Sequence, residues 1–499
     1  MIFLGVDCGT QSTKTLALDI DSGAVLAVAQ KGYEILPATA LGAMEQNPTD
    51  WRDAADETIR EVIVALGARK GEVRGIGVSG QQHGLVVLDA AGEVVRPAKL
   101  WNDTSTVAQC EEIHRHFGGP ERVIELAGNP MLPGYTAPKI LWLRENEPEN
   151  WKRTKAVLLP HDYLNFWLTG ERRMEYGDAS GTALLDVRER IWCEPIVNFV
   201  ADDLAGKLPP PGSSRQPAGN VRDALLSEWG LAHPVIVSAG GGDNMMSAIG
   251  TGNIAPGVVT ASLGTSGTLC AFSAAPVVDR AGEVAAFCDS TDHWLPLVCT
   301  MNVTLVTEAA RHLFGWSHAA CDEAVKSVRP GCDGLLLLPY LSGERTPNLP
   351  DGCGVLHGIT TANFTPAHLV RAAMEGVTLG LGYGLQRLRE LGVAPAEIRL
   401  TGGGSLSPAW RQICADIFGV PVVGLASGEG GGLGAALQAA WQYSRLRGED
   451  GAMSALVSRF VKCDESARAL PGGDAVEIYR GLLERAALLR NALTDRQLL

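Results

Sequence analysis

The first residues that could do chemistry lie near the start of the chain, in a short loop that follows the apolar run 2–6. In the loop Asp7–Lys14 a carboxylate precedes a glycine turn, and hydroxyl side chains follow it. Backbone N–H groups and hydroxyls in such a turn can hydrogen-bond phosphoryl oxygens, and a glycine permits close approach. The residues in these positions are Gly9, Thr10, Ser12 and Thr13. A purely structural turn would show the same pattern, because Gly-Thr pairs are common where strands end.

Asp7 faces the same place and would repel a phosphate unless a cation lay between them. Mg²⁺ suits this position, since it binds few protein carboxylates and keeps several waters. The sequence therefore predicts Asp7 as a ligand of Mg²⁺ beside bound phosphates.

The chain repeats this pattern about halfway along. The β-branched run 258–262 leads into Gly264, Thr265 and Ser266, and an apolar strand follows. Gly9 and Gly264 are separated by about half of the 499 residues. Two related halves that face each other would place both loops at one cleft.

A polar cluster follows the predicted strand 73–79. Gln81, Gln82 and His83 lie between two glycines, and each of these side chains can both donate and accept hydrogen bonds, as a polyhydroxy ligand requires. Trp101 could stack on the apolar face of a sugar. The alternatives are a polar turn and a core tryptophan.

Further glycine turns lie in the second half. Residues 240–242 are glycines that precede Asp243 at the start of an apolar helix, where the carboxylate could enter a cleft or act as an N-cap. The turn 402–404 could admit a flat or ribose-like group. The glycines between 428 and 434 are equally well explained by close helix contact.

The spacing of apolar residues predicts the helices and strands that must position these loops. We expect a hairpin over 15–29, a helix that starts at Asn47 and Pro48, and a long helix over 366–391. The segment after about residue 445 indicates only amphipathic helix. Proline and serine cluster at 209–217, which predicts a linker and a domain boundary.

Composition restricts the class of protein. The formal charge of −14 disfavours a nucleic-acid or anionic-membrane surface. The eleven cysteines are scattered without Cys-x-x-Cys, which favours reduced thiols in a cytoplasmic protein over zinc or disulfides. No export signal or membrane span is expected. We expect the protein to bind a small molecule and to bind neither nucleic acid nor membrane. A homodimer is possible.

From Ile2 to about Ala440 the sequence resembles the FGGY carbohydrate kinases of the sugar kinase, heat-shock chaperone and actin superfamily, with greatest similarity to kinases of xylulose. The specific motifs are Asp7–Lys14, Gly80–Gly84, Leu100–Asp103, Tyr135–Asn146, Gly241–Asn244, Ser262–Gly267, Leu338–Pro347 and Gly354–Glu375. Their shared order makes the resemblance specific.

The resemblance implies an α/β protein with two ribonuclease-H-like domains flanking a deep cleft. Residues 1–217 would bind sugar and residues 218–499 would bind ATP. It implies phosphorylation of D-xylulose to D-xylulose 5-phosphate, with Asp243 as catalytic base and Asp7 serving metal and phosphates. The implied sugar-binding residues are Gln82, His83, Trp101 and Asn244. The implied ATP-binding residues are Gly9, Thr10, Ser12, Thr13, Gly264, Thr265, Gly403 and Gly404.

The chain departs from the pattern at Gln82, where bacterial xylulose kinases often carry Met. Glycerol kinases carry an Arg-Glu pair at the positions of Gln82 and His83, so glycerol is disfavoured. Two alternatives stay open: a kinase for ribulose, L-xylulose or an alditol, and a non-catalytic, ATP-gated interaction protein.

Overall fold

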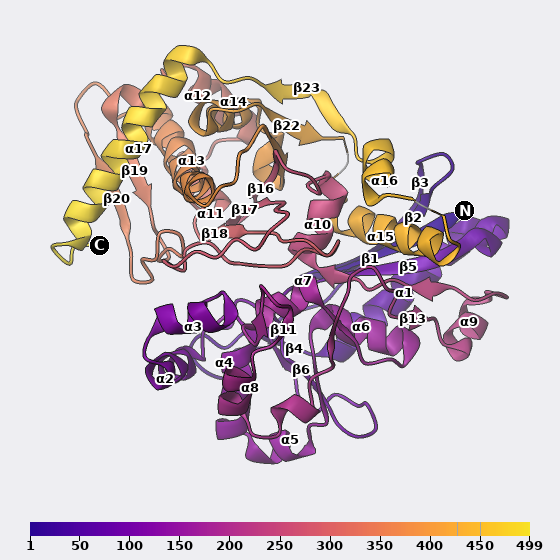
Figure 1. The fold of residues 1–499 in the computed structure, drawn as a ribbon. Coiled ribbons are helices and arrows are strands. Elements are labelled where there is room, and N and C mark those ends of the chain that lie inside the picture. The colour runs from indigo at the N-terminus through magenta and orange to yellow at the C-terminus, as the bar shows by residue number, and fades with distance from the viewer. Residues whose placement is uncertain (427, 450) are drawn as a thin grey trace.

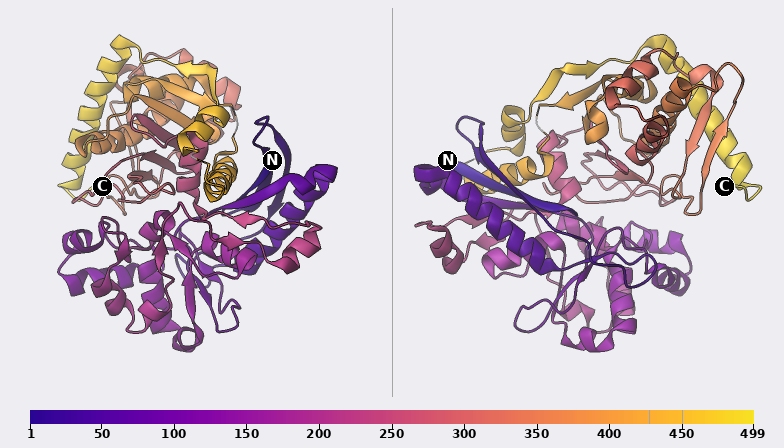
Figure 2. Two further views of the ribbon diagram at one scale, coloured as in Figure 1. Left: turned by 45° about the vertical axis from the view of Figure 1, so that its right-hand side comes forward. Right: turned by 180° about the vertical axis from the view of Figure 1, so that it is seen from behind.

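The structure is a computed structural model that describes residues 1–426, 428–449 and 451–499. The chain forms two sheets, one from each half of the sequence, with helices packed on them. Figure 1 and both views of Figure 2 show the purple segments below and the orange and yellow segments above, with the indigo strands near the N-terminus to one side. No helix among the described residues has the length and apolarity needed to cross a bilayer.

The N-terminal sheet has the order β13-β14-β5-β1-β2-β3, and β15 also pairs with β5. β1 and β2 form an antiparallel hairpin, β3 extends it, and β5 runs parallel to β1. The bounds are β1 Ile2–Cys8, β2 Ser12–Asp19, β3 Val25–Gly32, β5 Val73–Gly80, β13 Gly219–Asn220, β14 Ile236–Val237 and β15 Gly241–Gly242.

The C-terminal sheet has the order β18-β17-β16-β21-β22-β23. Its strands are β16 Val258–Leu263, β17 Gly267–Ala271, β18 Leu297–Thr300, β21 Glu397–Thr401, β22 Val422–Leu425 and β23 Cys463–Ala469. β16 and β17 form an antiparallel hairpin, β18 extends it, and β21 runs parallel to β16. The two sheets share this plan, which confirms that the halves are related.

The alternation of β1 explains why helices cover both faces of the N-terminal sheet. Ile2, Leu4 and Val6 pack with the apolar face of α1 (Pro48–Leu66). Phe3 points the other way and packs with α15 (Gly430–Leu446). Because successive side chains of a strand alternate between faces, a wholly apolar strand is buried on both. Asn47 occupies the predicted N-cap position of α1, although its side chain makes no capping hydrogen bond.

Glycines let α15 pack very close to the sheet and to α10 (Asp243–Thr251). A Cβ at Gly5 would lie 1.8 Å from the carbonyl oxygen of Gly432, and one at Gly434 would lie 1.9 Å from that of Met246. Neither position can hold a larger residue without separating the backbones. Helix contact is therefore the reason for Gly434. Figure 1 shows α10 and α15 where the two halves meet.

Three further helices are α4 (Thr136–Asn146), which supports the site, and α13 (Pro366–Glu390) and α17 (Gly473–Thr494), which belong to the C-terminal half. The long helix predicted over 366–391 is confirmed to within one residue. The segment after residue 445, predicted only as amphipathic helix, also contains strand β23, which completes the edge of the C-terminal sheet.

The predicted linker at 209–217 packs against the N-terminal half. Pro211 and Gly212 form β12, which pairs with β9 (Met174–Glu175). Ser214 is buried and its hydroxyl donates to Glu175 at 2.5 Å. The boundary at 217 also divides the N-terminal sheet, because β13, β14 and β15 follow it and still pair there. We propose a boundary near residue 250 in its place.

Candidate active site

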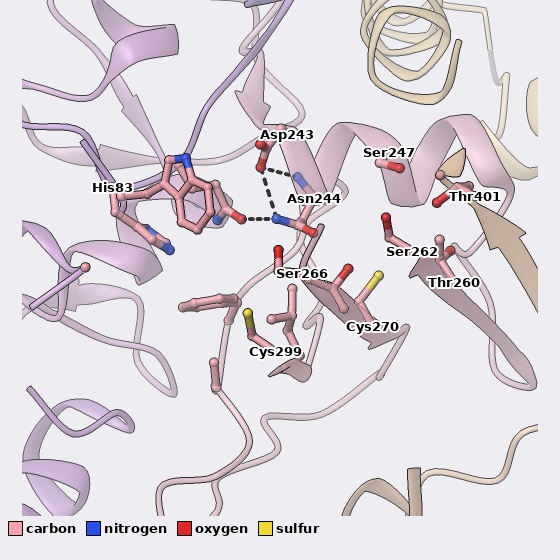
Figure 3. A pocket seen from close by; sticks show the side chains of 18 of the residues that line it. His83, Asp243, Asn244, Ser247, Thr260, Ser262, Ser266, Cys270, Cys299 and Thr401 are labelled. Carbon is pink, nitrogen blue, oxygen red and sulfur yellow. Dashed lines mark hydrogen bonds between the residues drawn. The ribbon is translucent and has the colours of Figure 1, made fainter. Parts of the chain in front are cut away.

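A cavity of about 430 Å³ lies between the two sheets. Figure 3 shows side chains from both halves of the chain around it. Its walls include six residues that the sequence predicts for catalysis or sugar binding: Asp7, Gln82, His83, Trp101, Asp243 and Asn244. The tertiary structure therefore brings together residues as far apart as 7 and 244.

Strand register explains how Asp7 and Asp243 meet. Asp7 of β1 pairs in register with Ser79 of β5, and Ser79 pairs in turn with Gly241 of β15. The three strands are parallel, so their carboxyl ends lie at one edge of the sheet. Asp243 follows β15 directly as the first residue of α10.

Asp7 is held by a hydroxyl and lies against a glycine. Ser79 Oγ donates to Asp7 Oδ1 at 2.7 Å. A Cβ at Gly431 would lie 2.7 Å from the Asp7 carboxylate, so this glycine keeps the space beside the carboxylate open. Burial raises the pKa of Asp7, while the Ser79 hydrogen bond and the charge of Lys14 oppose the rise. A cation beside Asp7 would stabilise its ionised form.

Asp243 has the electrostatics of a general base. Burial, followed by repulsion from Asp7 and Asp178, raises the pKa of Asp243 to about 7. Its Oδ1 accepts from the backbone N–H of Asn244 at 2.8 Å and from Asn244 Nδ2 at 3.0 Å. Gly242 is the N-cap of α10, so Asp243 does not take the structural N-cap role that the sequence left open. A carboxylate that titrates near neutral pH and is fixed in a cavity can take up a proton from a bound hydroxyl.

The side-chain amides of Asn244 and Gln82 connect Asp243 to the residues that the sequence predicts for sugar binding. Asn244 Nδ2 donates to Gln82 Oε1 at 2.7 Å, and Gln82 Nε2 contacts Met245 Sδ at 3.2 Å. Figure 3 shows the first of these bonds beside Asp243. Both amides lie at the cavity wall, where they can hydrogen-bond a polyhydroxy ligand.

His83 has an unusual backbone that the fold supports. Its φ is 62°, a conformation that is uncommon outside glycine. Its carbonyl oxygen accepts from Lys139 Nζ at 2.8 Å and from Thr136 Oγ1 at 3.2 Å, both on α4. The ring packs edge-on against Tyr135, with centroids 5.1 Å apart. Burial lowers the pKa of His83 well below its usual value, so the ring is neutral at pH 7.

Trp101 lines the cavity and is hydrogen-bonded to the loop Asp7–Lys14. Its Nε1 donates to Thr10 Oγ1 at 3.0 Å, and Thr10 Oγ1 donates to Gln81 Oε1 at 3.2 Å. The hydroxyl of Thr10 is therefore already engaged within the protein. Gly9, Thr10 and Ser12 line an adjoining hollow of about 340 Å³ that Asp7 also borders.

Thr13 does not fit the predicted phosphate-binding role. It is buried within β2, and its hydroxyl contacts the Tyr33 hydroxyl at 3.3 Å. The alternation along β2 turns this side chain into the core, whereas the prediction treated all the loop hydroxyls alike.

The C-terminal side of the cavity is built by residues next to those predicted to bind ATP. Ser262, Ser266, Thr401 and Gly402 line it, whereas Gly264, Thr265, Gly403 and Gly404 do not. Ser262 of β16 and Thr401 of β21 are in register at the ends of parallel strands. The sequence signal for both was a hydroxyl at the end of a β-branched or apolar run. Other cavity residues that the sequence did not single out as site residues are Tyr135, Ser247, Cys299, Arg345 and Gly431.

Comparison with known families agrees with this geometry. Residues 2–250 match the N-terminal domain of the FGGY family of carbohydrate kinases, and residues 259–443 match its C-terminal domain. The chain belongs to the FGGY family of carbohydrate kinases. The predicted family and fold class are thereby confirmed, and membership implies the use of ATP.

Individual members of the family that are similar to this chain include several kinases of xylulose. The chain is 39% identical to the xylulose kinase of Haemophilus influenzae, over 97% of this chain and 98% of that protein. It is 39% identical to the xylulose kinase of Streptomyces coelicolor, over 97% of this chain and 95% of that protein. Among solved structures it superposes on a xyloylose kinase from Brucella ovis with a TM-score of 0.92 and 29% identity, covering 99% of this chain and 100% of that one.

Proposed function

We propose that this protein transfers the terminal phosphoryl group of ATP to the terminal hydroxyl of D-xylulose, which yields D-xylulose 5-phosphate. The observation that carries the proposal is the position of Asp243, whose carboxylate titrates near neutral pH beside a Gln82–Asn244 amide pair in a cavity shared by both sheets. The xylulose kinases at 39% identity over nearly the full chain support the choice of sugar.

In this reaction Asp243 accepts the proton of the attacking hydroxyl. Asn244 donates to Asp243 Oδ1 through both its backbone and its side chain, which fixes the orientation of the carboxylate. The same Asn244 amide contacts Gln82, so the base and the sugar-binding residues form one hydrogen-bonded unit. Positioning of this kind accounts for much of the rate of phosphoryl transfer.

The residues around Asp7 fit Mg²⁺. The carboxylate is a hard oxygen ligand, its burial disfavours the ionised form in the absence of a cation, and Gly431 leaves space beside it. Among the described residues no group of three or more His, Cys, Asp or Glu side chains is placed to hold a metal. Asp7 would therefore hold the ion together with phosphate oxygens and water, and the ion would neutralise charge on the transferred phosphoryl group.

The two halves take different substrates in this proposal. The N-terminal half supplies Gln82, His83 and Trp101 for the sugar, and the C-terminal half supplies Ser262, Ser266 and Thr401 for ATP. All eleven cysteines lie within the described residues and are free thiols, which suits the reducing environment of the cytoplasm.

A coupled ADP-release assay tests the proposal with ATP and Mg²⁺ against D-xylulose, L-xylulose, D-ribulose, L-ribulose, glycerol and several alditols. We expect a clear preference for D-xylulose. If the enzyme preferred another polyol, the proposed mechanism would stand and the proposed substrate would be wrong. Hydrolysis of ATP that no sugar alters would refute the kinase reaction and favour an ATP-gated interaction protein.

A further inference from the structure

Arg345 brings a cation into the sugar-binding cavity from the C-terminal half of the chain. It lies in the loop after β19 (Leu336–Pro339) and lines the same cavity as His83 and Tyr135. Its side chain is half-buried. The base and amide residues of the site come from the other side of the cleft, so Arg345 is placed to contact the same ligand from the opposite half.

The loop holds the backbone of Arg345 firmly on both sides. The buried Glu344 carboxylate accepts from the backbone N–H of Met301 at 2.6 Å and from Asn302 Nδ2 at 3.0 Å. Thr346 is also buried, and its hydroxyl donates to the carbonyl oxygen of Glu283 at 3.0 Å. A side chain between two anchored neighbours is presented in a defined direction, as a specificity element requires.

The guanidinium of Arg345 has little to bind within the protein. Its one side-chain hydrogen bond among the described residues is a weak contact from Nη1 to Cys299 Sγ at 3.6 Å, and no described carboxylate forms an ion pair with it. The nearby acids are engaged elsewhere: Glu344 by the donors named above, and Glu283 by Tyr383 at 2.8 Å and Arg387 at 3.2 Å. A partly desolvated arginine without an acceptor is costly, so a ligand oxygen would stabilise it.

The position of Arg345 identifies which end of the ligand it meets. Its partner Cys299 and the base Asp243 lie on opposite sides of the cavity in Figure 3. The hydroxyl that receives the phosphoryl group lies beside Asp243. The group near Arg345, His83 and Tyr135 is then the other end of an extended sugar.

We propose that Arg345 determines specificity by donating to the two oxygens at the end of the sugar remote from the phosphorylated hydroxyl. In an open-chain 2-ketose these are the carbonyl oxygen and the hydroxyl on the adjacent carbon. The planar guanidinium presents two parallel N–H groups, which match two acceptors on neighbouring atoms better than a lysine ammonium does. The inference rests on the proposed function, because it names the chemical feature by which the kinase recognises a ketose.

The test compares Arg345→Gln, Arg345→Lys and wild type on D-xylulose and on xylitol, the alditol of the same length without the carbonyl. We expect Arg345→Gln to raise KM for D-xylulose by about 10- to 100-fold, the range for lost hydrogen bonds to a charged donor, with KM for ATP unchanged. Activity on xylitol should fall much less. Arg345→Lys, which keeps the charge, should lie between wild type and Arg345→Gln.

Arg329→Gln is the control, because Arg329 is 84% exposed and pairs with Asp333 at the surface. An equal loss on D-xylulose and xylitol would overturn the assignment, and so would a raised KM for ATP, which would make Arg345 a phosphate ligand. Wild-type rates in both variants would also overturn it. Failure of the proposed function is separable, since it appears as a wild-type enzyme inactive on every ketose.

Discussion

At the scale of single residues, the cavity has buried titratable groups whose pKa values are displaced toward neutrality. Burial raises the pKa of Asp243 to about 7 and lowers that of Lys139 to about 7. Asp243 contacts the cavity directly, whereas Lys139 Nζ donates to the carbonyl oxygens of His83 and Gly134 from behind the wall. Asp243 is suited to proton transfer, and Lys139 is suited to holding the backbone of His83, which we propose as a sugar-binding residue.

Asp243→Asn should lower kcat by about 10²- to 10⁴-fold, the usual contribution of a general base, while ATP binding persists. For wild type, kcat/KM should rise with pH as Asp243 ionises, with a midpoint near 7. Steady-state kinetics from pH 5.5 to 9 would check both expectations. Retention of near-normal turnover by the variant would contradict the role of the base.

The same group makes a prediction about stability. An acid whose pKa is raised on folding from 3.8 to about 7 binds more protons in the folded state, so its contribution to stability is lost as pH rises from about 4 to 7. Asp243→Asn removes this loss. Its melting temperature relative to wild type should therefore increase from pH 5 to pH 8, as differential scanning calorimetry can measure. If the difference in melting temperature between the variant and wild type did not change with pH, the pKa of Asp243 would not be raised in the folded protein.

Lys139→Met should raise KM for the sugar about tenfold, because the carbonyl oxygens of His83 and Gly134 each lose a charged donor and the backbone of His83, at a φ of 62°, is held less firmly. KM for ATP should be unchanged. The matched control is Lys152→Met, since Lys152 is 70% exposed and pairs only with Glu149 among the described residues. Equal KM values for sugar in wild type and Lys139→Met would mean that His83 needs no support from α4.

At the scale of elements, the site depends on how closely α15 approaches α10 and the N-terminal sheet. Asp243 begins α10, and Gly431 in the first turn of α15 lies against Asp7. A change in this packing would move both carboxylates at once. Stability and catalysis are therefore coupled through one glycine-rich helix contact.

Gly434→Ala should reduce the free energy of unfolding by about 2 to 3 kcal/mol, because its methyl group would lie 1.9 Å from the carbonyl oxygen of Met246 and the helices must separate. Gly481→Ala in α17 is the control. That glycine is helical with no atom within 4 Å of an added Cβ, so the change should stabilise by roughly 0.5–1 kcal/mol. Urea denaturation of both variants would measure the contrast, and similar values would contradict the close-contact explanation.

At the scale of the whole molecule, one cavity takes its walls from two sheets of the same plan. Asp7 and Asp243 come from the N-terminal sheet and its α10, while Ser262 and Thr401 end strands of the C-terminal sheet. Ligands that contact both walls should draw the halves together. The closed cleft would then exclude water, which could otherwise attack ATP.

Small-angle X-ray scattering should therefore show a smaller radius of gyration with D-xylulose and a non-hydrolysable ATP analogue together than with either alone. An unchanged radius would indicate that the cavity is already in its reacting form. ATP hydrolysis without sugar should be slow in either case if Asp243 acts on the sugar hydroxyl.

The secondary-structure elements and most of the reactive side chains could be predicted from the amino-acid sequence. The glycine loops, the hairpins and the residues Asp7, Gln82, His83 and Asp243 were all readable, because apolar periodicity and turn chemistry are local properties of the chain. Local signals could not determine which neighbours of a loop face the cavity. Thr13 points into the core, and Ser262 and Thr401 meet only through the register of β16 with β21.

Contacts between residues that are distant in sequence followed only from the folded structure. Residues 219–242 return to the first sheet after a proline-rich segment that looks like a linker, because pairing with β5 lies beyond any local pattern. The pKa of Asp243 depends on Asp7 and Asp178, which are remote in sequence. Arg345 lines the cavity from the other half of the chain. Charge, burial and register act through space, and only the folded chain specifies which groups they join.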